Sequence, residues 1–177
     1  MLGIYDMNNY HRQYERAKRY LERIRSIYAG TYSLTDGADN CDDEIISFFI
    51  HCYHIRDWIL HLSKIPITPT EIDRFINENE ALKICADLCN GEKHCRLERT
   101  TRTGGQPHLA FREWQVTHFT FESGFPSTQK ARYKILSGDQ WIDALAVAEE
   151  SMKLWEKFML NLQKQFACAI GDNNETV

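Results

Sequence analysis

Hydrophobic residues recur with the three-to-four-residue spacing of amphipathic helices over the first half of this chain. Gly30 ends the first such segment, because glycine readily adopts the backbone conformation that closes a helix. Acidic residues at 42–44 suit the start of the next segment, and Pro66 and Pro69 interrupt the pattern after it. The pattern predicts four helices, over about residues 7–29, 42–63, 68–77 and 80–94.

Beyond the fourth helix the apolar positions alternate with polar ones, as they do in half-buried strands. Glycine and proline at 104–107 and 123–126 mark turns between these strands. Helical spacing returns from about 140 to 169, with Trp141 and Trp155 among its apolar residues. The sequence therefore predicts one long final helix, preceded by three strands over about residues 96–103, 109–121 and 130–136.

Together these elements predict a mainly α protein. We expect a bundle of four to five helices, with a small antiparallel β insertion at about residues 96–136 before the long C-terminal helix. The chain has 177 residues, of which 43% are hydrophobic, so it is long enough for one domain over 1–177 and too short for two full ones. The polar residues 171–177 predict a disordered tail.

The formal net charge of -4 excludes a protein that is basic throughout, so affinity for nucleic acid would require a local basic patch. One candidate patch lies on the first helix, where arginine and lysine outnumber glutamate between residues 11 and 28. The other combines cations of the β insertion with neighbouring aromatic residues that could stack on a base. Its binding candidates are Arg99, Arg112 and Trp114.

No apolar run approaches the ~18 residues that a membrane-spanning helix requires, and the first residues do not form a secretory leader. The sequence therefore predicts a cytoplasmic protein without membrane contact, whose six cysteines are reduced. The cysteines at 85, 89 and 95 lack the C-x2-C spacing of structural zinc sites. We expect the first two of them to be small core residues.

Two polar stripes lie on helices that we expect to pack together. On the second helix, at about 100° per residue, four polar side chains between 51 and 61 fall within an arc of roughly 120°. On the fourth helix, polar residues at 87, 90 and 94 share one face. Packed side by side, the two helices would form a pocket, and its binding candidates are His51, His54, Asp57 and Asp87.

Arg56 and His61 form an R-x4-H motif on the second helix, and residues 90–94 read Asn-Gly-Glu-Lys-His. Both features resemble motifs of the HEPN superfamily of helical domains, over about residues 42–94 and the last helix. The resemblance implies an RNA-linked protein of a toxin–antitoxin or phage-defence system, which forms homodimers and has a protein partner such as an antitoxin. Active members are metal-independent ribonucleases, so no cofactor is implied.

As a ribonuclease of this kind, the chain would use His61 or His94 as acid or base, because histidine titrates nearest neutral pH. Arg56 and Lys93 would hold the phosphate, and Asn90 would orient it or a histidine. On a regular helix Arg56 and His61 point about 140° apart, so this site requires a kink or a second protomer. The resemblance thus implies the catalytic candidates Arg56, His61, Asn90, Lys93 and His94.

Two other functions are open at this point. The polar stripe of the second helix could offer two or three metal ligands, with Asp87 or His94 completing the shell of an iron or zinc ion. Alternatively, a non-catalytic module could bind RNA, a nucleotide or a protein, with the β insertion as its contact surface. In that case Arg56 and Asp57 would form ion pairs that tie helices together.

Overall fold

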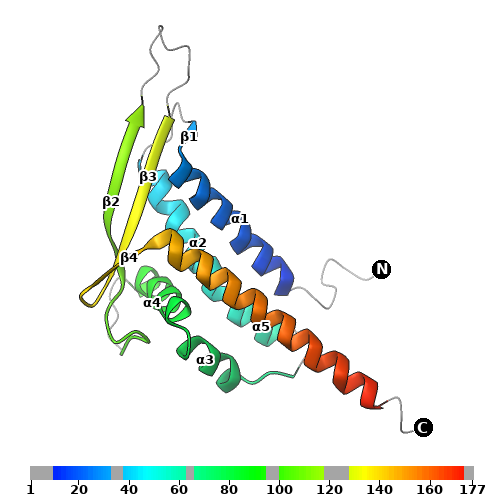
Figure 1. Ribbon diagram of the computed structural model, residues 1–177. Helices are drawn as coiled ribbons and strands as arrows, with labels where there is room; N and C mark the ends of the chain where they lie inside the picture. The colour runs from blue at the N-terminus through cyan, green and yellow to red at the C-terminus, as the bar shows by residue number, and fades with distance from the viewer. Residues whose placement is uncertain (1–9, 33–37, 63–65, 95–99, 118–127, 174–177) are drawn as a thin grey trace.

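The computed structural model describes residues 10–32, 38–62, 66–94, 100–117 and 128–173 (Figure 1). Helices account for most of these residues, and the strands form one small sheet. The predicted fold class, mainly α with an antiparallel β insertion before a long C-terminal helix, is confirmed. The helices are α1 (Tyr10–Ala29), α2 (Ala38–Leu62), α3 (Pro69–Asn77), α4 (Glu80–His94) and α5 (Ala144–Asn173), and the strands are β1 (Thr31–Tyr32), β2 (His108–Thr117), β3 (Thr128–Ser137) and β4 (Gln140–Asp143).

Helix α2 lies at the centre of the helical layer, where it packs against α1, α4 and α5. One face of α2 is buried, as the helical spacing of its apolar residues predicts. Trp155 of α5 is also buried and packs beside Phe75 of α3. Each such side chain contributes roughly 1.5–3 kcal/mol by leaving water. The buried apolar residues of α2 are Cys41, Ile45, Phe48, Phe49, Cys52, Ile55 and Ile59.

Local signals in the sequence fix the helix ends. Thr68 forms a capping box at the start of α3: its backbone N–H donates to the Glu71 carboxylate over 2.8 Å, and its hydroxyl accepts from the Glu71 N–H. Gly30, with a φ of 106°, closes α1 by donating its N–H to the Ser26 carbonyl. Both ends agree with the sequence prediction.

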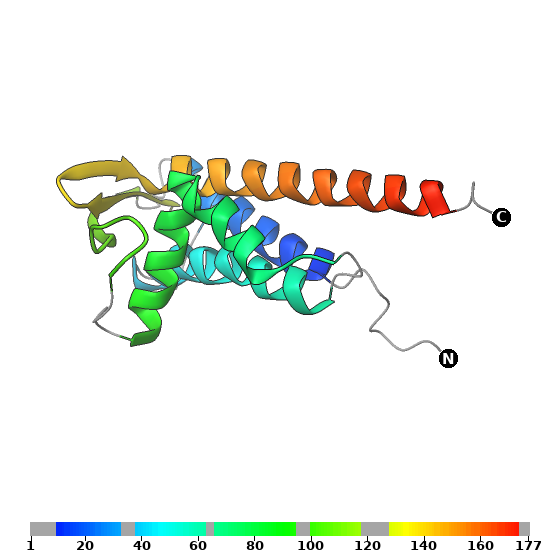
Figure 2. The ribbon, with the colours of Figure 1, turned by 90° about the horizontal axis from the view of Figure 1, so that it is seen from below.

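Strand β3 is the central strand of the antiparallel sheet, with β2 along one edge and β1 and β4 along the other. Its side chains alternate: those of Ala131, Tyr133 and Ile135 are buried against the helices, and those between them are not. The helices gather on one side of the β2–β3 pair, and no described element covers its other side (Figures 1 and 2). The sheet therefore has a helix-facing side and an open side.

The end of the β insertion differs from the sequence prediction. Residues 140–143, predicted to begin the final helix, form β4, because Gly138 and Asp139 make a two-residue turn that pairs Ser137 with Gln140. Gly138 has the positive φ of 58° that such a turn requires. Trp141 is consequently 55% exposed rather than part of the core. The final helix begins at Ala144 instead.

Three smaller predictions also change. Residues 100–103 form a loop rather than a strand, and residues 95–99 lie outside the described part of the chain. Thr31 and Tyr32, predicted as a loop, pair with β3. Helix α5 extends to Asn173, so residues 171–173 are helical rather than part of a tail.

Candidate functional site

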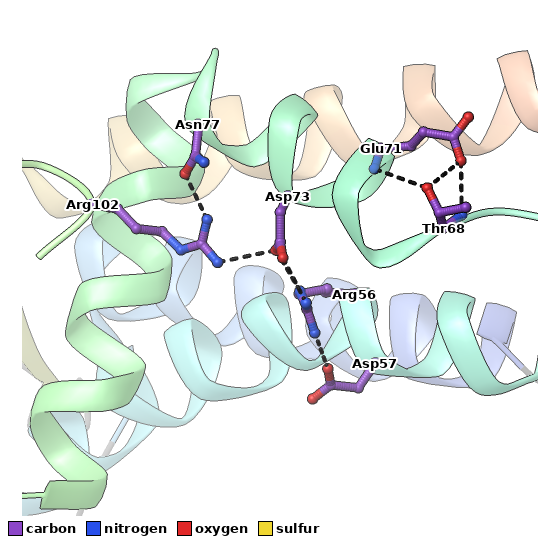
Figure 3. Close-up of polar contacts among 7 residues, drawn as sticks. All are labelled: Arg56, Asp57, Thr68, Glu71, Asp73, Asn77 and Arg102. Atoms are coloured by element: carbon purple, nitrogen blue, oxygen red, sulfur yellow. Dashed lines mark hydrogen bonds and ion pairs between the residues drawn. The ribbon is translucent and has the colours of Figure 1, made fainter.

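Arg56, the arginine of the R-x4-H motif, is engaged by two carboxylates (Figure 3). Its Nε and Nη2 donate to the two oxygens of Asp73 on α3, over 2.7 and 2.9 Å, and its Nη1 donates to Asp57 over 2.8 Å. Arg102 also donates to Asp73, over 3.0 Å, and to Asn77. The Arg56 side chain is only 19% exposed. The ion pairs that the sequence left open as an alternative for Arg56 are therefore present, and they tie α2 to α3 and to the 100–103 loop.

The electrostatics of this cluster favour the charged forms of both Arg56 and Asp73. Hydrogen bonding to Arg56 holds the pKa of Asp73 below its usual value, with further help from Arg102. The bonds to Asp73 and Asp57 in turn raise the pKa of Arg56. All three nitrogens of the Arg56 guanidinium donate to these carboxylates, so only two of its five N–H groups are left for a phosphate.

The other catalytic candidates are spread over two helices. His61 lies exposed near the end of α2, and Lys93 and His94 lie exposed in the last turn of α4. Asn90 is half-buried on α4, which continues through it to His94. Within the described ranges, no hydrogen bond or ion pair joins any of these residues to Arg56 or to one another. Whether these residues form the R-x4-H site with a kink or a second protomer stays a prediction of the sequence.

Asp87, expected as a binding or metal-ligating residue, is 2% exposed and holds a loop instead. One carboxylate oxygen accepts from the Arg102 N–H over 2.9 Å, and the other accepts from the N–H and the hydroxyl of Thr103, each over 2.8 Å. These bonds take three of the roughly four acceptor sites of the carboxylate inside the protein. Asp87 therefore holds the 100–103 loop, and its ligand-binding role stays a prediction of the sequence.

His51 contacts α1 rather than the other histidines of its stripe. The Gln13 amide donates to the His51 carbonyl oxygen over 2.8 Å and lies 3.3 Å from the His51 Nδ1. The Tyr20 ring packs against the imidazole, with 4.8 Å between centroids. Burial lowers the pKa of His51, and the charges of Arg16, His54 and Arg19 lower it further. This histidine sits in a cationic environment on the α1–α2 face.

His54 turns the other way, toward Cys89 of α4, whose Sγ lies 4.0 Å from its Nε2. Burial raises the pKa of that thiol to about 11, so it stays protonated at neutral pH. Asp57 pairs with Arg56. Among the residues that the structure describes, no three His, Cys, Asp or Glu side chains converge closely enough to hold a metal ion. The iron or zinc site considered from the sequence is not formed there, because neighbouring helices draw its members apart.

We expect His51 to titrate below the ordinary histidine value of 6.5, because burial and the nearby guanidiniums disfavour its charged form. Because the pKa of His51 is lower in the folded state, the neutral imidazole contributes to folding stability at a pH above the pKa of the unfolded chain. That contribution is lost as the pH falls through the unfolded and then the folded pKa. An NMR titration of the imidazole measures the pKa directly. Arg19→Met should raise it, whereas Lys18→Met should leave it within experimental error. An unshifted His51 would contradict the described cationic environment.

The binding candidates of the strands lie on the side of the sheet that faces the helices. Arg112 donates to Asp42 over 2.6 Å, and its guanidinium lies 5.7 Å from the Trp114 ring. Tyr133 donates to the other oxygen of Asp42. Arg112 is thus neutralised, and Trp114 is half-buried and packs against the core. Arg99 lies outside the described residues.

The open side of the sheet carries a different set of cations and aromatic rings. Lys130, Arg132 and Lys134 alternate along β3 on this side, and none of them pairs with a described carboxylate. Phe111, the cross-strand neighbour of Lys134, is 51% exposed, and Trp141 lies on the same side. A shallow hollow of about 170 Å³ is lined by Glu113, Gln115, Lys130 and Arg132. We call the residues Phe111, Glu113, Gln115, Lys130, Arg132, Lys134 and Trp141 the open sheet face.

The cations and aromatic residues of this face are visible in the sequence, but which of them share a side depends on where each strand begins and how it pairs. Residues two apart on a strand share a side, so Arg112 and Trp114 cannot share a side with Phe111. Glu113 lies directly opposite Arg132, which assigns both to the open side. The sequence prediction of a basic, aromatic strand surface grouped residues from both sides.

Comparison of the chain with protein-family models, with curated proteins and with solved structures finds no match. Within the described residues, no helix contains a stretch long and apolar enough to cross a lipid bilayer.

Proposed function

We propose that this protein is a non-catalytic RNA-binding module that holds single-stranded RNA on its open sheet face. The observation that carries the proposal is the coincidence of three unpaired cations with two exposed aromatic rings on one uncovered side of the sheet. The protein as a whole has a net charge of -4, so this face is a local exception. Such an exception favours an anionic ligand.

The spacing of the cations suits an extended phosphate backbone. Alternate residues on a strand are about 6.6 Å apart, which is comparable with the separation of successive phosphates in an extended single strand. Arginine and lysine elsewhere in the described structure are often paired: Arg23 with Glu44, Arg25 with Glu149 and Arg56 with Asp73. A paired cation has little left to offer a phosphate, whereas those of the open sheet face gain a partner on binding.

The aromatic rings favour single-stranded RNA over a duplex. Unpaired bases can stack on exposed rings, whereas the bases of a duplex are already stacked on one another. Phe111 lies on β2 and Trp141 on β4, so they flank the central strand that carries the cations. Exposing two large apolar rings on an uncovered sheet is costly unless a ligand covers them.

The engagement of Arg56 by Asp73 and Asp57 supports the non-catalytic form of this proposal. The HEPN-like relationship stays a prediction of the sequence, as do a second protomer and a protein partner such as an antitoxin. Within that relationship, we propose that the R-x4-H arginine of this chain has a structural role and that RNA contacts lie on the sheet.

The proposal predicts that RNA affinity depends on the open sheet face. Lys130→Glu/Lys134→Glu should weaken binding of a labelled single-stranded RNA at least about tenfold, measured by fluorescence anisotropy at low salt. Lys153→Glu/Lys157→Glu, which makes the same charge change at exposed positions of α5, is the matched control and should stay within about twofold. Trp141→Ala should lose about 1–3 kcal/mol of binding free energy if a base stacks there.

Three phosphate contacts give a slope near −2 when the logarithm of the association constant is plotted against the logarithm of salt concentration, at about −0.7 per contact for single strands. Equal losses in the two double variants would mean that binding follows net charge alone, and would overturn the proposal. The labelled RNA should remain intact during the measurement. Cleavage by the native chain that His61→Ala abolishes would instead establish the ribonuclease that the sequence resemblance implies.

A further inference from the structure

The buried amide of Gln13 has only one possible orientation. Its nitrogen lies 2.8 Å from the His51 carbonyl oxygen, which can only accept, and its oxygen lies 2.9 Å from an Arg16 guanidinium nitrogen, which can only donate. The side chain is 1% exposed, so reversing the amide would leave both partners unsatisfied away from water. The amide nitrogen is therefore the group that faces His51.

This orientation also fixes the tautomer of His51. The Gln13 nitrogen lies 3.3 Å from Nδ1, so Nδ1 must be the acceptor, and the proton of the neutral imidazole resides on Nε2. No described residue accepts a hydrogen bond from Nε2. Trp155 Nε1 is the one buried side-chain nitrogen or oxygen without a partner in the described structure, so His51 Nε2 reaches solvent. The imidazole therefore presents a fixed N–H donor that no described residue uses.

Two arginines of α1 lie near this imidazole. Arg16 and Arg19 are three residues apart on the same face of α1, and Arg16 bonds the Gln13 amide that contacts His51. Their charges, with that of His54 on α2, lower the pKa of His51. The Arg16 guanidinium also lies 5.8 Å from the Trp58 ring, which steadies it. No described carboxylate forms an ion pair with Arg16 or Arg19, whereas Arg23, one turn further along α1, is paired with Glu44. Within the described part of the chain, Arg16 and Arg19 therefore have no anionic partner.

We propose that the His51 Nε2–H and the guanidiniums of Arg16 and Arg19 form a binding site for a phosphate group. Each phosphate oxygen is a strong acceptor, and guanidinium groups bind such oxygens in pairs. A neutral imidazole donor adds a directed hydrogen bond without adding to the repulsion between the cations. The site lies on the α1–α2 face and is independent of the open sheet face.

The test is a titration with inorganic phosphate at pH 7 and constant ionic strength, followed by calorimetry and by the His51 imidazole signals in NMR. The native chain should bind, and Arg19→Met and His51→Phe should each weaken binding at least about tenfold, because each removes a direct donor. His51→Phe keeps a ring against Tyr20 and keeps the backbone carbonyl that Gln13 uses. Lys18→Met, an exposed neighbour of Arg19, is the matched control and should bind as the native chain does.

Further arms identify the source of the phosphate and separate this site from the RNA proposal. Adenosine monophosphate is compared with short RNAs that carry a 5′-phosphate or a 5′-hydroxyl; preference for the phosphorylated RNA that Arg19→Met removes assigns an RNA terminus. Lys130→Glu/Lys134→Glu should bind inorganic phosphate normally even if it loses RNA. Absence of phosphate binding by the native chain, or binding that survives both Arg19→Met and His51→Phe, overturns the site.

Discussion

Replacing Asp87 with asparagine is expected to lower the free energy of unfolding by about 3–5 kcal/mol. The reason is that one of the two buried acceptor oxygens becomes an NH2 donor that faces other donors. Asp87 is 2% exposed and accepts three hydrogen bonds, from the Arg102 N–H and from the N–H and hydroxyl of Thr103. An asparagine side chain has one acceptor oxygen and an NH2 group that would face a donor. The loop would have to open to let water in.

Urea unfolding of the native chain and the variant at pH 7 measures this difference. Asp139→Asn is the matched control, since it makes the same chemical change at an exposed turn position, and we expect it to stay within about 0.5 kcal/mol of the native chain. Hydrogen exchange at Arg102 and Thr103 should accelerate in Asp87→Asn. If Asp87→Asn costs no more than Asp139→Asn, the carboxylate does not hold the loop, and that result would favour the ligand-binding role predicted from the sequence.

Replacing Arg56 with methionine is expected to lower the free energy of unfolding by about 2–4 kcal/mol. This loss is smaller than that expected for breaking a fully buried ion pair, because Asp73 is partly exposed. Methionine keeps most of the volume but leaves Asp73, whose side chain is 31% exposed, with Arg102 as its remaining cation. Arg56→Lys should recover only part of the loss, because an ammonium group cannot donate to both oxygens in the planar geometry of a guanidinium. Arg74→Met, at an exposed position of α3, should be nearly neutral.

The Arg56 contribution should depend on pH in a definite direction. Because the pKa of Asp73 is lowered in the folded state, its ion pairs add stability above its ordinary value of 3.8, and that addition is lost as the pH falls through the lowered pKa. The difference between native and Arg56→Met unfolding free energies should therefore shrink in acid. Should Arg56→Met instead leave stability unchanged and abolish an RNA-dependent activity, Arg56 would be available to phosphate, as the R-x4-H resemblance implies.

The helices of this protein could be predicted from sequence because their signals are local. Apolar spacing, the Thr68 capping box and Gly30 depend on residues within a turn or two of one another, so each element agrees with its own sequence. The same reasoning failed at 140–143, where alternating strand and helical patterns are too short to distinguish. There the two-residue turn at Gly138 and Asp139 determined the outcome by allowing β4 to pair with β3.

The roles of the polar residues depended on contacts between distant segments. The sequence by itself determined which residues carry charge and that helical stripes and a basic strand exist. Only the tertiary structure decided that Asp73 on α3 would neutralise Arg56 and that the loop after α4 would cover Asp87. It also decided that no described element would cover the open sheet face. In each of the first two cases the contacting residues are at least 15 positions apart in the sequence. Such contacts cannot be predicted from the spacing of residues within one helix or strand.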